Sequence, residues 1–345
     1  MAGFVASIAG VGPQLARFAS GNDCHDIPSS RQAMALPEAW WRDRLPMPPC
    51  LTRSITAARS SGAAGSLPAF PVAAPLERSE GRVELTFKRQ GPLTVLGHLH
   101  QSGCGKARLP RSADPAHAEA VLLNLAGGLT GGDRLAWQVT WQAGAAATVS
   151  GQAAEKIYRA RGSSRAEIDT ELRVAADALA LWLPQATILF DRARLVRRNR
   201  FTVARGGRLL AVEATIMGRQ AMGETVAEGV FDERFEVRYG DRLVLADRQL
   251  LRGSIADRLA RPAVAAGAAG LVTLLYVGET AGEGLGAIRD ALGPLAAASA
   301  PAPHLVLARW LTREPRILHR DLAAALLALQ AAVGLPARLP NVWCC

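Results

Sequence analysis

Residues Ala166-Glu167-Ile168-Asp169-Thr170-Glu171-Leu172-Arg173-Val174 alternate strictly between charged side chains and small, apolar or β-branched ones. Successive side chains of a β-strand point to opposite faces, so this segment predicts a strand with one buried and one solvated face. The same period of two recurs at 83–87, 135–141 and 231–239. Turn-forming glycines separate these segments, and no helical pattern lies between them. We therefore expect a mainly β, layered body of many short strands rather than a parallel α/β sheet.

Helical signals appear late in the chain. A short helix is expected over 285–292. A longer one is expected over 321–333, where an acidic residue opens a Leu/Ala-rich stretch that ends at Gly334. No fixed-period repeat is visible.

Residues 1–78 differ from the rest, because Pro, Ser, Ala and Gly dominate and no apolar periodicity persists. We interpret them as a poorly ordered, dispensable extension, or as the product of a start placed too far upstream. The folded domain is then expected over residues 79–345.

The chain has 345 residues, of which 49% are hydrophobic, and 40 basic against 30 acidic residues give a net charge of +10. Basic residues alternate with acidic ones along most segments instead of clustering, which argues against a nucleic-acid partner. A solvated mixed-charge surface is the simplest interpretation. Spare arginines would also suit acidic protein partners.

Five cysteines, at positions 24, 50, 104, 344 and 345, follow no disulfide or zinc spacing, which fits a reducing cytoplasm. The Cys344-Cys345 pair could ligate a metal, although a plain tail is the simpler interpretation. The apolar start lacks the positive leading region of a secretory signal. The longest later apolar run, 262–277, is shorter than the roughly 20 residues that span a bilayer. We expect a cytoplasmic protein with no membrane partner.

Four short motifs carry most of the functional information. In chain order they are Gly127-Gly128-Leu129-Thr130-Gly131-Gly132-Asp133-Arg134, Glu155-Lys156-Ile157-Tyr158-Arg159, Leu183-Pro184-Gln185-Ala186-Thr187-Ile188-Leu189-Phe190-Asp191 and Gly218-Arg219-Gln220-Ala221-Met222-Gly223-Glu224. None combines a nucleophile, a base and an oxyanion donor, so they favour a scaffold over an enzyme. The glycine cluster lacks the lysine of a phosphate loop, so no GTP binding is expected.

Four acids beside apolar strands or glycine turns are candidates for lining a polar cavity: Asp133, Asp191, Glu213 and Glu224. A carboxylate in such a place needs a partner or water. Surface or arginine-paired carboxylates are the simpler interpretation, and an acid pair for glycoside hydrolysis is a further alternative. His98 and His100 would project from one strand face near Cys104 and could hold a soft divalent ion, but a solvated face is the simpler interpretation. We assign no resident metal.

The four motifs, in this order, closely resemble those of the urease accessory protein D family (UreD/UreH). The resemblance covers about residues 81–343, including the ending Pro340-Asn341-Val342-Trp343, and one departure is Ala186 where the family pattern has Glu. The motif positions that we single out are Gly127, Gly128, Gly131, Gly132, Lys156, Tyr158, Arg159, Pro184, Gln185, Gly218, Arg219 and Gly223.

The resemblance implies a β-helix-like stack with a few α-helices, and a non-catalytic scaffold for urease maturation. Its partners would be apo-urease, accessory protein F and, through F, the accessory GTPase G. Ni(II) would pass transiently to the urease active site, with no tightly bound cofactor. We consider the four acids as candidates for lining its path. Two alternatives remain from the residues alone. They are a carboxylate-based small-molecule enzyme on a β-rich fold, and a β-rich structural or self-assembling protein.

Overall fold

The structure is a computed structural model that describes residues 77–343. The predicted extension over 1–78 lies outside this part, except for its last two residues. Its disorder and dispensability remain predictions.

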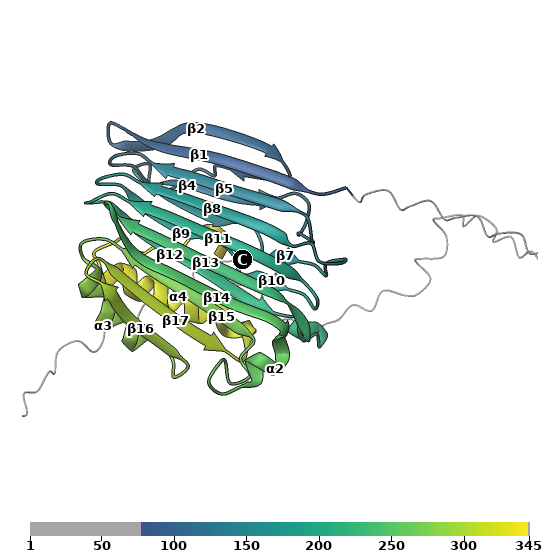
Figure 1. Cartoon of the computed structure of the whole chain (residues 1–345). Helices are drawn as coiled ribbons and strands as arrows, with labels where there is room; N and C mark the ends of the chain where they lie inside the picture. Colours follow the sequence, from purple (N-terminus) through teal and green to yellow (C-terminus); the bar gives the residue numbers. More distant parts are fainter. Residues whose placement is uncertain (1–76, 344–345) are drawn as a thin grey trace, which may run out of the picture. The chain divides into compact units, whose positions relative to one another are not determined.

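Two facing sheets form the body (Figure 1). The first sheet has seven strands in the order β14-β13-β11-β8-β5-β1-β2. Their bounds are β1 (Glu80–Gln90), β2 (Leu93–Gly103), β5 (Arg134–Trp141), β8 (Ala166–Val174), β11 (Arg194–Val203), β13 (Glu228–Tyr239) and β14 (Arg242–Ser254).

The second sheet has ten strands, eight of them in the order β16-β17-β15-β12-β9-β6-β4-β3. Short strands β7 and β10 pair with each other, and β10 also pairs with β12. The bounds are β3 (Gly105–Arg108), β4 (Ala118–Asn124), β6 (Ala146–Gly151), β7 (Glu155–Ile157), β9 (Leu179–Leu183), β10 (Thr187–Leu189), β12 (Arg208–Met217), β15 (Gly270–Val277), β16 (Ala296–Ala302) and β17 (Leu305–Thr312).

The middle of the chain winds as a β-solenoid-like stack, as expected. Strands β5, β8, β11 and β13 are parallel neighbours, and the chain reaches each one by way of a strand in the second sheet. A parallel connection usually crosses over through a helix. Here β6, β9 and β12 take that place. Leu135 pairs with Ile168, Ile168 with Arg197 and Arg197 with Glu233, so successive coils are offset by 33, 29 and 36 residues. These unequal offsets explain why the sequence shows no fixed repeat.

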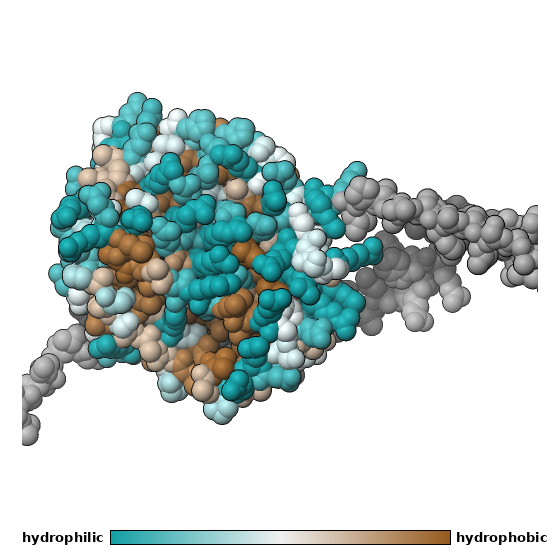
Figure 2. Space-filling view, viewed as in Figure 1, coloured by the Kyte–Doolittle hydropathy of each residue, from teal (hydrophilic) through white to brown (hydrophobic). Residues whose placement is uncertain are grey.

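The predicted alternation is confirmed in the first sheet. In β8 the buried positions include Ala166, Ile168, Thr170, Leu172 and Val174. Its outer face carries charges that pair across strands: Arg198 Nη1 lies 2.9 Å from Glu167 Oε2 and 3.2 Å from Asp169 Oδ2. Figure 2 shows a surface on which hydrophilic residues dominate, interrupted by hydrophobic patches.

The centre of the second sheet, strands β9, β12 and β15, is buried on both faces. One face packs inside the stack, and the other packs against helices α3 (Ala281–Ala291) and α4 (Pro315–Ala332). In β12, Leu209 belongs to the inner core and Leu210 to the core under the helices. This explains why β9 is apolar at every position, because a strand covered on both sides shows no alternation.

The C-terminal ending is held against the third motif. Residues Asn341–Trp343 form a short 3-10 helix. The indole Nε1 of Trp343 donates to the Leu183 carbonyl at 3.1 Å, and the Gln185 amide donates to the Val342 carbonyl at 3.0 Å. Motif residues Leu183 and Gln185 therefore anchor the end of the domain.

The helices differ from expectation in their bounds. Helix α3 begins four residues before the predicted start at 285, and α4 begins at Pro315 rather than 321. Proline suits the first turn, since it has no amide hydrogen to leave unbonded. Gly334 ends α4 in the left-handed region with φ 68°, as expected. Helix α2 (Ile255–Ala260) was not predicted, because six residues are too few to show a period. No helix within 77–343 is long and apolar enough to cross a membrane.

Two adjacent leucines of α4 provide a stability test. Leu326 is fully buried in the core under the helices, whereas 37% of Leu327 is exposed. Leu326→Ala should lower the free energy of unfolding by about 2–5 kcal/mol, because it leaves a cavity. Leu327→Ala should lower it by less than about 1 kcal/mol. Urea denaturation measures both, and equal losses would contradict the packing of α4 described above.

Candidate functional site

The four motifs meet along one edge of the stack, which we call the turn edge: segments 125–133, 156–165, 190–193 and 218–228. This edge lies at the end of the stack marked by β7 and β10 in Figure 1. Backbone hydrogen bonds join its segments in sequence, from Gly132 N to Arg165 O at 2.9 Å, from Ala160 N to Arg192 O at 3.1 Å and from Arg192 N to Glu228 O at 2.9 Å. Motifs far apart in the chain thus form one continuous surface.

Side-chain contacts add to this series of backbone hydrogen bonds between the turns. Tyr158 Oη donates to the Gly127 carbonyl at 3.0 Å, and the Tyr158 ring meets Phe190 edge-on at 5.0 Å between centroids. The Arg219 guanidinium lies 4.5 Å above the Phe190 ring. A Cβ on Gly128 would lie 2.4 Å from the Tyr158 ring, so this glycine is required for the close approach.

Three of the four candidate acids hold turns on this edge. Asp133 accepts hydrogen bonds from Ser79 N at 2.9 Å and Thr130 N at 2.7 Å. Asp191 accepts one from Glu228 N at 3.1 Å.

The third, Glu224, accepts from Arg219 Nε at 2.8 Å and from Asp191 N at 3.4 Å. The hydrogen bond from the Arg219 side chain is the main reason why the pKa of Glu224 lies below its usual value. The oxygens of all three acids are therefore engaged in local structure.

The fourth acid, Glu213, lies in the interior and lines a cavity of about 250 Å³. Exposed residues of the motifs, Gly127 and Lys156, line its outer part, and buried Glu213 lines its deep part. Polar and charged groups contribute much of the wall: Asn124, Gln152, Glu155, Lys156, Thr170, Gln185, Thr187, Arg197 and Glu213. The cavity thus connects the turn edge with a buried polar centre.

Arg197 is that centre. Only 3% of it is exposed, and its guanidinium joins both sheets. Nε lies 2.6 Å from Glu233 Oε1, and Nη1 lies 2.9 Å from Glu213 Oε2. Nη1 also donates to Thr187 Oγ1 at 2.8 Å, and Nη2 donates to Thr215 Oγ1 at 2.9 Å. We call Arg197, Glu213 and Glu233 the buried triad.

The triad places one cation against two carboxyl groups. Burial raises the pKa of Glu233 to about 7, although Arg197 opposes this effect. Burial by itself would lower the pKa of Arg197, but Glu213 and Glu233 outweigh it and raise that pKa. Glu213 also accepts a hydrogen bond from Trp182 Nε1 at 3.0 Å. With both carboxyl groups ionised, the triad carries one surplus negative charge at the deep end of the cavity.

Glu155, from the second motif, is another carboxylate of the cavity wall. Burial raises its pKa, and the Asn124 amide donates to its Oε1 at 2.9 Å. The cavity therefore offers carboxylate, hydroxyl and amide oxygens, which are weak and exchangeable ligands for divalent cations.

Sequence reasoning missed Arg197 and Glu233. Both stand at inward positions of their strands, in phase with Leu195 in β11 and with Phe231 in β13. The alternation places both charged residues on the buried face of their strands, and a buried charge requires partners. This pattern could have identified them from the sequence.

The histidines considered as metal ligands, His98 and His100, are exposed on β2, and Cys104 is a half-buried free thiol in the turn after it. Within residues 77–343, no three His, Cys, Asp or Glu side chains are placed to hold a metal ion together. The Cys344-Cys345 pair lies outside the described residues.

Comparison with known proteins identifies the family of this chain. The family model described as UreD urease accessory protein matches residues 79–344. The chain belongs to the UreD family. It is 43% identical over 223 residues to urease accessory protein UreD of Agrobacterium fabrum, an alignment that covers 65% of this chain and 78% of the relative. Identity to UreD of Rhizobium leguminosarum bv. trifolii is 42% over 268 residues, covering 77% and 96% of the two chains. Identity to UreD of Brucella suis is 38% over 273 residues, covering 78% and 95%. The predicted family resemblance is confirmed.

The buried triad predicts a dependence of stability on pH. Glu233 has an ordinary pKa of 4.5 and a folded-state pKa of about 7, so the folded chain binds the extra proton between these values. The resulting stabilisation is complete below pH 4.5 and is lost as the pH rises towards 7. Glu233→Gln should therefore make the free energy of unfolding decrease less steeply across this range.

Glu236→Gln is the matched control, because Glu236 lies on the same strand with its side chain 49% exposed. It should keep the slope of the parent chain. Urea titrations at half-unit pH intervals give these slopes, and an unchanged slope in Glu233→Gln would refute the burial-induced shift.

Proposed function

We propose that this chain is a non-catalytic scaffold for urease maturation. It acts in the cytoplasm, binds apo-urease and accessory protein F, and reaches the accessory GTPase G through F. Ni(II) passes as cargo along its interior cavity towards the urease active site. Family membership supports the role in maturation. The observation that carries the nickel path is the cavity that links exposed motif residues with buried Glu213.

The chemistry of the cavity wall suits passage rather than storage. Its described lining residues include two carboxylates and several neutral oxygen donors, and neither a thiol nor an imidazole. Such a set binds a divalent ion weakly, whereas soft ligands hold late transition metals more tightly. A route along which the ion moves from ligand to ligand requires the weaker, oxygen-donating ligands.

Arg197 favours the release of a metal ion bound at the deep end of the cavity. A divalent cation that reaches Glu213 competes with a guanidinium 2.9 Å from the same carboxylate. The cation gains Coulomb energy in a low-dielectric site, but the guanidinium remains ready to replace it. The same pairing engages both buried carboxylates, so we favour the scaffold over a carboxylate-based enzyme.

Glu213→Gln is the sharpest test of the nickel path. The substitution keeps the shape of the side chain and removes its charge, so binding of partners should persist while nickel delivery slows. We expect the nickel content of urease after a fixed activation time to fall by about tenfold, equivalent to about 1.4 kcal/mol. Metal analysis of urease that is co-produced with each variant measures the effect, with Glu236→Gln as the matched control. Normal loading by Glu213→Gln would refute its role.

Asp133→Asn, Asp191→Asn and Glu224→Gln complete this series, because a nickel role for these three acids remains a prediction. Their carboxylates hold turns, so each variant also needs a measurement of stability. Slower nickel loading with unchanged stability would place the acid on the path. If nickel loading slows in proportion to the loss of free energy of unfolding, the acid only stabilises its turn.

A further inference from the structure

The turn edge gathers several exposed cations that form no ion pair within residues 77–343. On the outer face of the first sheet, cations pair with neighbouring acids at 2.5–3.2 Å, as in Arg82–Glu84, Arg173–Glu171, Arg198–Glu167, Arg234–Asp232, Arg248–Asp232 and Arg238–Glu236. These pairs neutralise that face locally.

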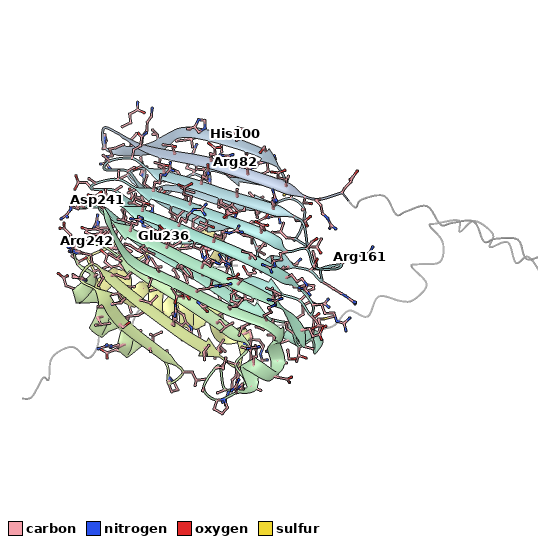
Figure 3. The ribbon with its side chains drawn as sticks, in the orientation of Figure 1. Arg82, His100, Arg161, Glu236, Asp241 and Arg242 are labelled. Atoms are coloured by element: carbon pink, nitrogen blue, oxygen red, sulfur yellow. The ribbon has the colours of Figure 1, made fainter. Side chains whose placement is uncertain are left out.

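On the turn edge, ion pairs among residues 77–343 involve only Arg219 with Glu224 and Arg192 with Asp191. Four exposed cations of the turn edge form no ion pair within 77–343, namely Lys156, Arg159, Arg161 and Arg165. Asp133, the acid of the first motif, is buried and occupied by backbone amides, and Glu228 is the one exposed acid of the edge, also without an ion pair within 77–343. The edge therefore carries net positive charge, and Figure 3 shows Arg161 pointing away from the body at its tip.

Large apolar side chains stand among these cations. Leu125 is 63% exposed, Met222 is 75% exposed and Tyr158 is 37% exposed. Tyrosine, methionine and arginine are enriched at the centres of protein interfaces. The hydrogen-bond ladder under them fixes the backbone before any partner arrives, which lowers the entropic cost of binding.

We propose that the turn edge is the surface that docks on apo-urease, against an acidic and partly apolar face of that protein. The inference rests on the proposed function, which supplies apo-urease as the partner. Because the edge is positively charged, its partner surface should be acidic. A second copy of this chain is disfavoured as the partner, because two cationic edges repel each other. The cavity opens on the same edge, since Gly127 and Lys156 belong to both. Docking there brings the cavity opening against the recipient of the metal.

The test is Arg159→Glu with Arg161→Glu in the full chain, co-produced with apo-urease. Both side chains are exposed and form no ion pair within 77–343, so the fold should tolerate the change. The matched control is Arg205→Glu with Arg242→Glu. These arginines are also exposed and unpaired in that part of the chain, and Arg242 lies at the opposite end of the stack from Arg161 (Figure 3).

We expect the turn-edge variant to bind apo-urease at least about tenfold more weakly than the parent, and the control to bind as the parent does. Parental binding should also weaken as the salt concentration rises. Affinity capture of apo-urease at two salt concentrations gives these ratios, and circular dichroism confirms that both variants fold.

Equal binding by the turn-edge variant and the control would overturn the docking surface while leaving the proposed function intact. Failure of the parent chain itself to bind apo-urease would overturn both. A labelled DNA duplex is included as a third probe. If the parent binds the duplex, and the turn-edge variant loses only that binding, the edge is a nucleic-acid surface and the inference is wrong.

Discussion

One guanidinium, buried between the two sheets, determines where the polar groups of the interior lie. A charge in that position is tolerated only when it is paired and fully hydrogen-bonded. Glu213 and Glu233 supply the charge, and Thr187 and Thr215 supply two further acceptors. Because these groups come from both sheets, the polar layer crosses the whole core. The cavity reaches this layer, and its deep end is therefore polar.

The winding of the chain places the motifs. Each coil leaves one sheet, turns, and enters the other, so the turns of successive coils lie side by side. Sequence motifs separated by about one coil become neighbours on a single edge. The Tyr158, Phe190 and Arg219 side chains pack in a row there, one from each of three successive turns. Motif glycines serve this arrangement, as Gly128 does beneath the Tyr158 ring. The four motifs thus lie on one surface and line part of the cavity that opens there.

Much of this fold was predictable from period-two alternation, since β8 and β13 have one solvated face each. The pairing of the strands was not predictable, because the coils differ in length and the sequence therefore shows no repeat. The site was predicted only in part. Glu213 was found as an acid within an apolar strand, but Arg197 and Glu233 were overlooked beside more numerous surface charges. Asp133 and Glu224 stand next to glycines just as cavity acids would, and only their hydrogen-bond partners identify them as holding turns.

In the proposed function, the buried triad serves the passage of Ni(II) rather than the stability of the fold. The most direct test is the triple variant Arg197→Met, Glu213→Leu and Glu233→Leu, since apolar replacement of a complete buried ion cluster is often neutral or stabilising. Its melting temperature and the nickel content of co-produced urease are measured together. We expect a melting temperature equal to or above that of the parent, with urease nickel near the level found without this chain. A folded triple variant that loads nickel as the parent does would rule out this role of the triad.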